Sequence, residues 1–411
     1  MKLSVNTQKY IDLETQYGAH NYAPLQVVLE RGLGARVWDV DGKEYLDFLS
    51  AYSAMNQGHS HPKIIAAMVE QASKITLTSR AFYNNRLGEY EKWMCEIFGF
   101  DRILPMNSGA EAVETALKLA RRWGYEIKKV HDGHAKILVC EDNFHGRTIS
   151  IISASTDPAS RKGFGPYTPG FEVIDYNDLP SLEKALQDPN VVGFLVEPIQ
   201  GEAGVVVPSD GYLKGASELC RKNRVLFIAD EVQTGLARTG KMLACDHEGV
   251  KPDLLILGKA LSGGMLPVSA VLTSNEVMLT LKPGEHGSTF GGNPMACAVA
   301  RASVQVLIDE KLAERAQRLG TIFRDELRAM NSPYIELVRG KGLLNAIVVK
   351  PHGKNEKGGL RTAIDVCHDL ADLGVLAKQT HVHAIRFAPP LVIAEGELEQ
   401  GLNAIRKVLQ A

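Results

Sequence analysis

Short apolar runs alternate with helical stretches through the middle of the chain, from about residue 60 to residue 295. Each run is continuously apolar and does not alternate with polar positions. Continuous apolar strands between helices are typical of a mostly parallel sheet that is covered on both faces. The pattern therefore predicts a large α/β domain. The clearest runs cover residues 136–140, 191–196, 225–229 and 254–257.

The two ends of the chain carry different patterns. Alternating residues on both sides of Asp41-Gly42 predict a β-hairpin within residues 36–48. From Ala296 to about Met330 the apolar positions have helical spacing. The remaining predicted elements are two strands around a glycine-rich turn in 334–349, a helix at about 360–373, and a strand and a helix in 384–410.

Together these patterns predict an α/β chain with a large, mostly parallel sheet domain and a smaller α+β domain. We expect the large domain to span residues 56–295 and the smaller one residues 296–411. The N-terminal segment, residues 1–55, is expected to pack with the smaller domain.

Two of the apolar runs lead directly to an ionisable residue. Asp230 follows the run 225–229, and Lys259 follows the run 254–257 inside a loop of small residues. In open α/β sheets, ligands bind outside the carboxyl ends of the strands, so both side chains are expected at one ligand-binding edge. An amine and a carboxylate there suit pyridoxal phosphate. Its Schiff base forms on a lysine, and its pyridinium nitrogen pairs with an acid.

A helix start that could hold a phosphate lies between residues 107 and 111. Ser108 and Glu111 have the spacing of a capping box, and Gly109 and Ala110 leave the backbone N–H groups accessible. Most capping boxes only cap a helix. Beside Lys259 and Asp230, however, this one becomes a candidate phosphate cradle.

Three other loops offer weaker candidates. Ser288 and Thr289 bring hydroxyls to a second glycine-rich loop, which by itself would be read as a surface turn. Phe144 could stack on a planar ring, and Arg147 could bind a carboxylate. The simpler interpretations are that Phe144 packs in the core and that Arg147 is solvated. Glu197 ends its apolar run as Asp230 does.

Composition narrows the function classes. A formal charge of −2 gives no reason to expect nucleic acid or an anionic membrane as a partner. The 6 cysteines are scattered and form no CxxC pair, which favours reduced thiols in a reducing compartment. The first residues lack a signal peptide or transit-peptide pattern, and no apolar stretch could span a bilayer. We therefore expect a cytoplasmic protein.

Two histidine pairs invite a metal interpretation. They are His59 with His61 and His381 with His383. Alternate residues of a strand share a face, but neither pair has a third ligand specified by the sequence. We expect no metal.

Several motifs together resemble the signature of class-III aminotransferases, a group of fold type I enzymes that depend on pyridoxal phosphate and move ω-amino groups. Within that family, further motifs are most similar to those of ornithine aminotransferases, and the similarity runs from about residue 15 to 410. The family motifs lie at 197–204, 230–235, 258–264 and 286–294. The narrower ones lie at 17–22, 52–59, 105–109, 146–148 and 386–390.

The resemblance implies a role for each cofactor-binding candidate. Lys259 would form the Schiff base and carry the proton, and Asp230 would pair with the pyridinium nitrogen. The ring hydroxyl would bind Gln233, and the ring would stack on Phe144. The phosphate would rest on residues 108–110, that is Ser108, Gly109 and Ala110, while Ser288 and Thr289 would reach the cofactor phosphate of a neighbouring subunit. The resemblance therefore implies a homodimer.

The resemblance also implies a reaction. The δ-amino group of L-ornithine would pass to 2-oxoglutarate in a ping-pong mechanism, giving L-glutamate 5-semialdehyde and L-glutamate. Tyr22 and Arg147 would hold the α-carboxylate of ornithine, and Tyr52 would line its channel. Arg386 would bind the α-carboxylate of glutamate or 2-oxoglutarate, and Glu202 would mask Arg386 while ornithine is bound. Such an enzyme would serve proline or arginine metabolism.

Two other functions stay open at this stage. The same scaffold could act on acetylornithine or on another ω-amino acid, although Tyr22 and Tyr52 favour a free α-amine with its carboxylate. A non-catalytic protein with this fold is the other alternative, against which the intact set of Lys259, Asp230 and Arg147 argues. Departures from related sequences are small and predict altered affinity, not altered chemistry. They are Ser108, Ala110, Phe290 and His145.

Overall fold

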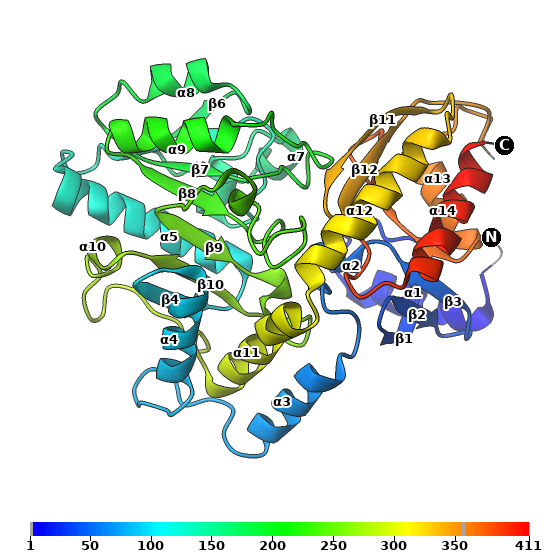
Figure 1. Ribbon diagram of the computed structural model, residues 1–411, viewed down its shortest axis with the longest axis horizontal. Coiled ribbons are helices and arrows are strands. Elements are labelled where there is room, and N and C mark those ends of the chain that lie inside the picture. The colour runs from blue at the N-terminus through cyan, green and yellow to red at the C-terminus, as the bar shows by residue number, and fades with distance from the viewer. Residues whose placement is uncertain (1–2, 356–357, 411) are drawn as a thin grey trace.

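The computed structural model describes residues 3–355 and 358–410 of the chain. Figure 1 shows two lobes joined by a narrower middle, with both chain ends in the lobe drawn on the right. The large lobe holds a 7-stranded sheet, and the small lobe holds two 4-stranded sheets. The predicted fold class, a large parallel-rich sheet beside a smaller α+β part, is confirmed.

The sheet of the large lobe has the order β4-β10-β9-β8-β7-β5-β6. Neighbours from β9 to β6 are parallel, whereas β10 is antiparallel to both β9 and β4. All the predicted apolar runs are strands of this sheet. The bounds are β4 Arg102–Met106, β5 Lys136–Cys140, β6 Phe171–Ile174, β7 Val191–Val196, β8 Leu226–Asp230, β9 Leu254–Leu257 and β10 Ser269–Thr273.

Helices cover both faces of this sheet, which explains why its central strands are apolar throughout. Alternate residues of a strand point to opposite faces. In β5, Ile137 and Val139 belong to the apolar cluster under α5, while Leu138 and Cys140 belong to the cluster under α8 and α9. The helices of this lobe are α3 Pro62–Ala72, α4 Leu87–Phe98, α5 Gly109–Trp123, α6 Ile149–Ser153, α7 Pro158–Arg161, α8 Leu179–Ala185, α9 Tyr212–Lys222 and α10 Asn275–Met278.

The small lobe combines both ends of the chain. One sheet, in the order β1-β2-β3-β13, pairs the N-terminal hairpin with a C-terminal strand, since β13 lies parallel to β3. The other has the order β11-β12-β15-β14. The elements are α1 Val5–Tyr17, β1 Leu29–Leu33, β2 Arg36–Asp39, β3 Glu44–Asp47, α2 Ser50–Ser53, β11 Ile335–Lys341, β12 Leu344–Val349, α13 Ala363–Asp372, β13 Val375–Leu376, β14 Lys378–Thr380, β15 Ala384–Phe387 and α14 Glu395–Leu409.

One sequence prediction was wrong in detail. The helical pattern from Ala296 to Met330 is not one helix but two, α11 Pro294–Asp309 and α12 Leu312–Ala329. The chain turns at Lys311, which has a left-handed φ of 49°. Apolar spacing resumes on the far side of the break, so periodicity alone does not reveal it.

Neither a membrane span nor a metal site is found in the described part of the chain. No helix there is both long and apolar enough to cross a bilayer. No cluster of three or more metal-ligating side chains occurs either. His59 instead contacts Asp47 at 2.8 Å, and His61 contacts Glu310 at 3.2 Å.

Candidate active site at the carboxyl edge of the sheet

The carboxyl ends of five strands converge on one edge of the large sheet. Asp230 is the last residue of β8, and Glu197 comes directly after β7. Lys259 follows β9, Ser108 follows β4, and residues 143–147 follow β5. Since the strands from β9 to β6 are parallel and β4 runs in the same direction, these residues share the edge where open α/β sheets bind ligands.

Asp230 is buried and held by two donors. His145 Nδ1 lies 2.7 Å from its Oδ2, and the backbone N–H of Val232 donates to its Oδ1 at 3.1 Å. Burial opposes a charge on His145, but its hydrogen bond to Asp230 and the charge of that carboxylate prevail and raise the pKa of His145. The pair therefore favours an imidazolium beside a carboxylate. Sequence reasoning gave His145 no such role.

Glu197 is a second buried acid at this edge. Its Oε1 accepts a hydrogen bond from the backbone N–H of Phe144 at 2.8 Å, and its Oε2 accepts one from Gly201 at 3.3 Å. Burial raises the pKa of Glu197 to about 7, and the nearby charge of His145 opposes that rise. The carboxyl group fixes the backbone that presents Phe144 and His145.

Lys259 stands on a strained backbone inside the protein. Its φ is 44°, in the left-handed region that non-glycine residues rarely adopt. Burial lowers the pKa of Lys259, and the charge of Asp230 opposes that effect. No hydrogen bond or ion pair holds its amine within the described residues. A desolvated, unpaired amine is suited to nucleophilic attack on a carbonyl.

The predicted capping box is confirmed. The N–H of Glu111 donates to Ser108 Oγ at 3.2 Å, and the N–H of Ser108 donates to Glu111 Oε2 at 2.6 Å. The N–H groups of Gly109 and Ala110 belong to the first turn of α5, where an anion is stabilised by the helix end. A Cβ at Gly109 would lie 3.0 Å from Val232, so this close approach is suited to glycine.

Ser288 already has partners within its own subunit. Its Oγ accepts from Asn107 Nδ2 at 2.9 Å and from the N–H of Gly291 at 2.9 Å. The loop of Ser288 therefore lies beside the start of α5, while Thr289 is exposed. The contact of Ser288 and Thr289 with the cofactor phosphate of a neighbouring subunit stays a prediction.

Arg386 is the most buried of the substrate-binding candidates, with a relative exposure of 1%. Its Nη2 lies 3.1 Å from Glu202 Oε1, and its Nη1 donates to Gln233 Oε1. The guanidinium also lies over the Tyr52 ring, 4.9 Å from the centroid. The structure thus brings three predicted residues, from α2 and two loops of the large lobe, around the Arg386 guanidinium on β15.

Tyr22 and Arg147 lie on the open side of the site. Tyr22 is 84% exposed. The Arg147 guanidinium lies 5.3 Å from the centroid of the Phe144 ring, and it has an ion pair of 3.8 Å with Asp157. No hydrogen bond or cation–π contact joins Tyr22 to Arg147 in the described chain, so their joint binding of a carboxylate stays a prediction.

The residues present fit pyridoxal phosphate. Lys259 supplies a desolvated amine, Asp230 a buried carboxylate backed by His145, and the start of α5 an anion-binding helix end. Two buried polar atoms, His145 Nε2 and Arg386 Nε, have no hydrogen-bond partner.

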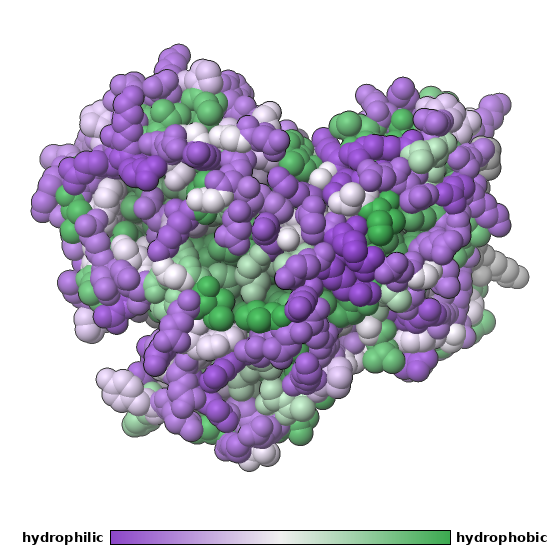
Figure 2. Space-filling view, viewed as in Figure 1, coloured by the Kyte–Doolittle hydropathy of each residue, from purple (hydrophilic) through white to green (hydrophobic). Residues whose placement is uncertain are grey.

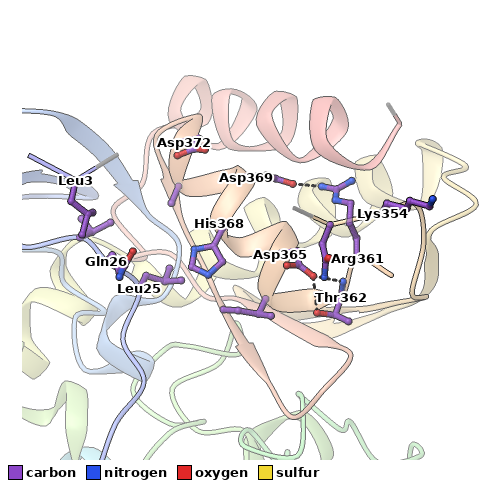
Figure 3. A pocket seen from close by; sticks show the side chains of 14 residues that line it. Leu3, Leu25, Gln26, Lys354, Arg361, Thr362, Asp365, His368, Asp369 and Asp372 are labelled. Atoms are coloured by element: carbon purple, nitrogen blue, oxygen red, sulfur yellow. Dashed lines mark hydrogen bonds and ion pairs between the residues drawn. The ribbon is translucent and has the colours of Figure 1, made fainter. Parts of the chain in front are cut away.

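A cavity of about 650 Å³ elsewhere in the molecule is not this site. Figure 3 shows it in the small lobe, between α13 and the N-terminal segment. Two of its charged lining residues, Arg361 and Asp369, form an ion pair with each other, and none of the candidate site residues lines it. The candidate active site is therefore identified by the reactive residues at the carboxyl ends of the strands, and not by the volume of a cavity.

Comparisons with known proteins agree with this geometry. Residues 17–409 match the family model of class-III aminotransferases. The mitochondrial ornithine aminotransferase of Rattus norvegicus is 58% identical over 98% of this chain and 91% of its own length. The ornithine aminotransferase structure from Toxoplasma gondii, reported with partial occupancy of pyridoxal phosphate, has a TM-score of 0.95 and 51% identity over 98% of this chain and 94% of that one.

A structure of acetylornithine aminotransferase from Elizabethkingia anophelis is also similar. It has a TM-score of 0.89 and 56% identity, and the match covers 99% of this chain and 100% of that one. The fold, the family model and the curated relatives agree on the reaction class. The chain is an enzyme of the class-III aminotransferase family.

Proposed function

We propose that the protein transfers the δ-amino group of L-ornithine to 2-oxoglutarate and yields L-glutamate 5-semialdehyde and L-glutamate. Relatives named ornithine aminotransferase, 51–60% identical over nearly the whole chain, support this reaction. The single structural observation that carries it is the ion pair of Arg386 with Glu202 beside Lys259.

The ion pair between Arg386 and Glu202 explains how ornithine could bind with its δ-amine, and not its α-amine, at the reacting position. One pocket must accept a δ-amine in the first half-reaction and an α-amine in the second. A free Arg386 would bind the α-carboxylate of ornithine and present the wrong amine. Glu202 occupies Arg386 during the first half-reaction and must release it for the dicarboxylate in the second, so the pair disfavours the wrong binding mode.

Pyridoxal phosphate, when bound, supplies the electron sink for removing a proton from the carbon that bears the amine. Lys259 would hold the cofactor covalently and move that proton, for which its lowered pKa suits it. Asp230, oriented by His145, would keep the ring nitrogen protonated. Phe144 would stack on the ring, Gln233 would bind its hydroxyl, and residues 108–110 would hold its phosphate.

Two substrate contacts are proposed on the open side of the site. Tyr22 and Arg147 would bind the α-carboxylate of ornithine. Tyr52 would line the side-chain channel, next to the Arg386 guanidinium. In this arrangement the carboxylate of ornithine would lie far from Lys259, and the δ-amine of ornithine would lie near Lys259.

An acetylornithine aminotransferase is the second candidate, because a structure carrying that name is 56% identical to this chain. An acyl group would remove the positive charge of the α-amine and add bulk near Tyr22 and Tyr52. We favour ornithine because two phenols beside an open, polar mouth suit a charged ammonium and carboxylate better than an amide.

We also propose a homodimer that completes the site. Ser288 and Thr289 would contact the phosphate bound to the other subunit. A large apolar side chain of this loop is exposed, since Phe290 has a relative exposure of 56%. Figure 2 shows an apolar area in the lower middle of the large lobe, with smaller apolar areas elsewhere on a mostly hydrophilic face. Exposed apolar surface of this kind marks protein contacts.

The donor preference tests the proposal. Initial rates with 2-oxoglutarate would be measured for L-ornithine, N-acetylornithine and 4-aminobutyrate at equal concentration. We expect ornithine to give the highest kcat/KM, by about tenfold or more, which corresponds to about 1.4 kcal/mol of transition-state binding. A higher value for N-acetylornithine would replace the substrate but retain the reaction class.

A further inference from the structure

Arg238 is a buried cation that the proposed chemistry does not use. It lies in the loop after β8, and its relative exposure is 0%. Its Nε and Nη2 donate to Asn56 Oδ1 at 3.0 and 2.6 Å. Its Nη1 donates to the carbonyl oxygens of Leu343, at 3.0 Å, and Pro389, at 2.7 Å. All these acceptors are neutral.

Each acceptor belongs to a segment that carries or supports a residue around Arg386. Asn56 follows the short helix α2, which holds Tyr52. Pro389 follows β15, which holds Arg386 itself. Leu343 forms the turn between β11 and β12, and β12 pairs with β15 opposite Arg386. The loop of Arg238 also contains Gln233, which accepts a hydrogen bond from Arg386.

Backbone contacts reinforce these connections in both directions. The N–H of Leu343 donates to the carbonyl of Arg238 at 3.1 Å, and Asn56 Nδ2 donates to the carbonyl of Leu236 at 2.8 Å. A Cβ on Gly342 would lie 2.3 Å from the Thr239 backbone, so the β11–β12 turn is in direct contact with the loop of the large lobe. In Figure 1, α2 lies where the two lobes meet.

The shape of the guanidinium matters here more than its charge. A buried cation without a carboxylate partner is costly, and burial lowers the pKa of Arg238 to about 9. The planar fork of arginine donates from Nε, Nη1 and Nη2 to acceptors on three segments at once, whereas the ammonium of lysine is a point charge on a flexible stem without this fixed geometry. A residue that is costly to bury and bonded to three segments is suited to fixing their relative positions.

We propose that Arg238 is a positioning residue for the dicarboxylate-binding state of the active site. It holds the segments of Tyr52 and Arg386 against the loop of Gln233, so that Arg386 meets an acceptor carboxylate in the correct place once Glu202 releases it. This inference rests on the proposed function, in which Arg386 binds the α-carboxylate of 2-oxoglutarate.

The test compares Arg238→Lys with a matched control, Arg324→Lys. Arg324 is also buried, and its Nη1 donates at 2.7 Å to the carbonyl of Gly342 and to Asn345 Oδ1, all within the small lobe. Calorimetry would measure the binding of glutarate, a dicarboxylate that cannot react, to each holoprotein. We expect binding about tenfold weaker in Arg238→Lys and within about twofold of wild type in Arg324→Lys.

A second readout follows the half-reactions separately. Protein loaded with pyridoxamine phosphate would be mixed with 2-oxoglutarate, and protein loaded with pyridoxal phosphate with ornithine, while absorbance is recorded. We expect Arg238→Lys to raise the half-saturating concentration of 2-oxoglutarate much more than that of ornithine. Equal losses in both halves, or equal losses in both variants, would reduce Arg238 to a general structural role and overturn the proposal.

Two further variants keep the test decisive if Arg238→Lys does not fold. Asn56→Asp retains an acceptor oxygen for Arg238 and should retain glutarate binding, whereas Asn56→Leu should lose it. Equal glutarate binding in these two variants would contradict the proposal. Failure of the wild-type protein to bind glutarate would refute the acceptor site and the proposed function. Normal wild-type binding with an unaffected Arg238→Lys variant would refute only the role of Arg238.

Discussion

The contacts of Arg386 show how single side chains determine which amine reacts. The guanidinium is buried against Tyr52 and Gln233, and among the residues that the structure describes only Glu202 provides an opposite charge within salt-bridge distance. Because a buried charge without a partner of opposite sign is unfavourable, binding of Arg386 to Glu202 or to a substrate carboxylate is favoured. Substrate choice in each half-reaction is therefore a competition for one cation.

Removing the charge of Glu202 should favour binding of a substrate carboxylate to Arg386. In Glu202→Gln the side chain keeps its shape but loses its charge, so the α-carboxylate of ornithine can bind Arg386 in the first half-reaction. We expect the ratio of α-amine to δ-amine transamination to rise about tenfold, or about 1.4 kcal/mol. Product analysis with ornithine would measure the ratio, and an unchanged ratio would contradict the masking role.

Glu197 predicts a pH dependence of stability. Its folded pKa of about 7 lies above the ordinary value of 4.5, because burial disfavours the charged form. Between these pH values the folded protein holds a proton that the unfolded chain has released, so this group's contribution to stability falls as pH rises. The loss is at most about 3 kcal/mol.

Thermal unfolding of the cofactor-free protein would measure this effect. Between pH 5 and pH 7.5, wild type should lose stability relative to Glu197→Gln, whose side chain does not ionise. His145 lies near Glu197, and the charge of Glu197 helps to raise the pKa of His145. The difference between the two proteins therefore reports the Glu197 carboxyl group together with its effect on His145. A difference that stays constant, or that changes in the opposite sense, would show that Glu197 is not buried as described.

For single residues, the sequence predicts which side chains lie at the ends of strands. It does not predict which side chains form pairs when they are far apart in the chain. Asp230 and Lys259 each follow a continuous apolar run, so their edge of the sheet could be predicted. His145 could not be assigned to Asp230, because the two lie 85 positions apart and only the folded sheet brings them together. The same is true of Arg238 and Asn56, which are 182 positions apart.

Among the elements, the turn at residues 50–53 is the most strained. Ser50, Ala51, Tyr52 and Ser53 have φ values of 52°, 46°, 60° and 73°. Left-handed backbone costs about 1–2 kcal/mol for each L-residue, so the surroundings must hold it. Asp47 does so at one end, since its Oδ1 accepts from the N–H groups of Leu49 and Ser50 at 2.8 Å.

Glycine at the exposed position of this turn should relieve strain. We expect Ala51→Gly to raise the free energy of unfolding by about 0.5–1 kcal/mol. The same change at Ala66, exposed in the regular helix α3, should lower it by about 1 kcal/mol. Urea unfolding of both variants would provide the comparison. A loss of stability at both positions would contradict the strain assigned to the turn.

Hydrophobic patterns predicted some helices and strands and missed others. Strands 136–140, 191–196 and 254–257 have the predicted bounds, because buried parallel strands are apolar at nearly every position; Lys136, at the start of β5, is the charged exception. Strands β4 and β6 carry Arg102, Pro105 and Glu172 and gave no such signal. The break at Lys311 was missed because a single left-handed residue leaves the flanking helical periodicity intact.

At the scale of the whole molecule, the exposure of Tyr22 and of Thr289 is consistent with a site that a second subunit completes. We expect the protein to sediment at twice the mass of one chain. Phe290→Asp should weaken that association, because it places a charge beside the proposed shared loop. Leu337→Asp, on the exposed face of β11 in the small lobe, serves as the control.

Sedimentation velocity over a range of concentrations would compare the three proteins. Dissociation of Phe290→Asp alone would support an interface at the 286–294 loop. Dissociation of neither variant, or of Leu337→Asp alone, would place the interface elsewhere. A wild-type protein that is monomeric at micromolar concentration would contradict the homodimer.

The central claim is that Lys259 binds pyridoxal phosphate and that ornithine donates its δ-amine there. The most direct measurement is the absorbance spectrum of the purified protein with pyridoxal phosphate, before and after adding L-ornithine, for wild type and Lys259→Ala. Wild type should show a cofactor band that ornithine converts to the pyridoxamine form, and Lys259→Ala should not turn over. A wild-type spectrum that ornithine leaves unchanged, or equal conversion in Lys259→Ala, would contradict the claim.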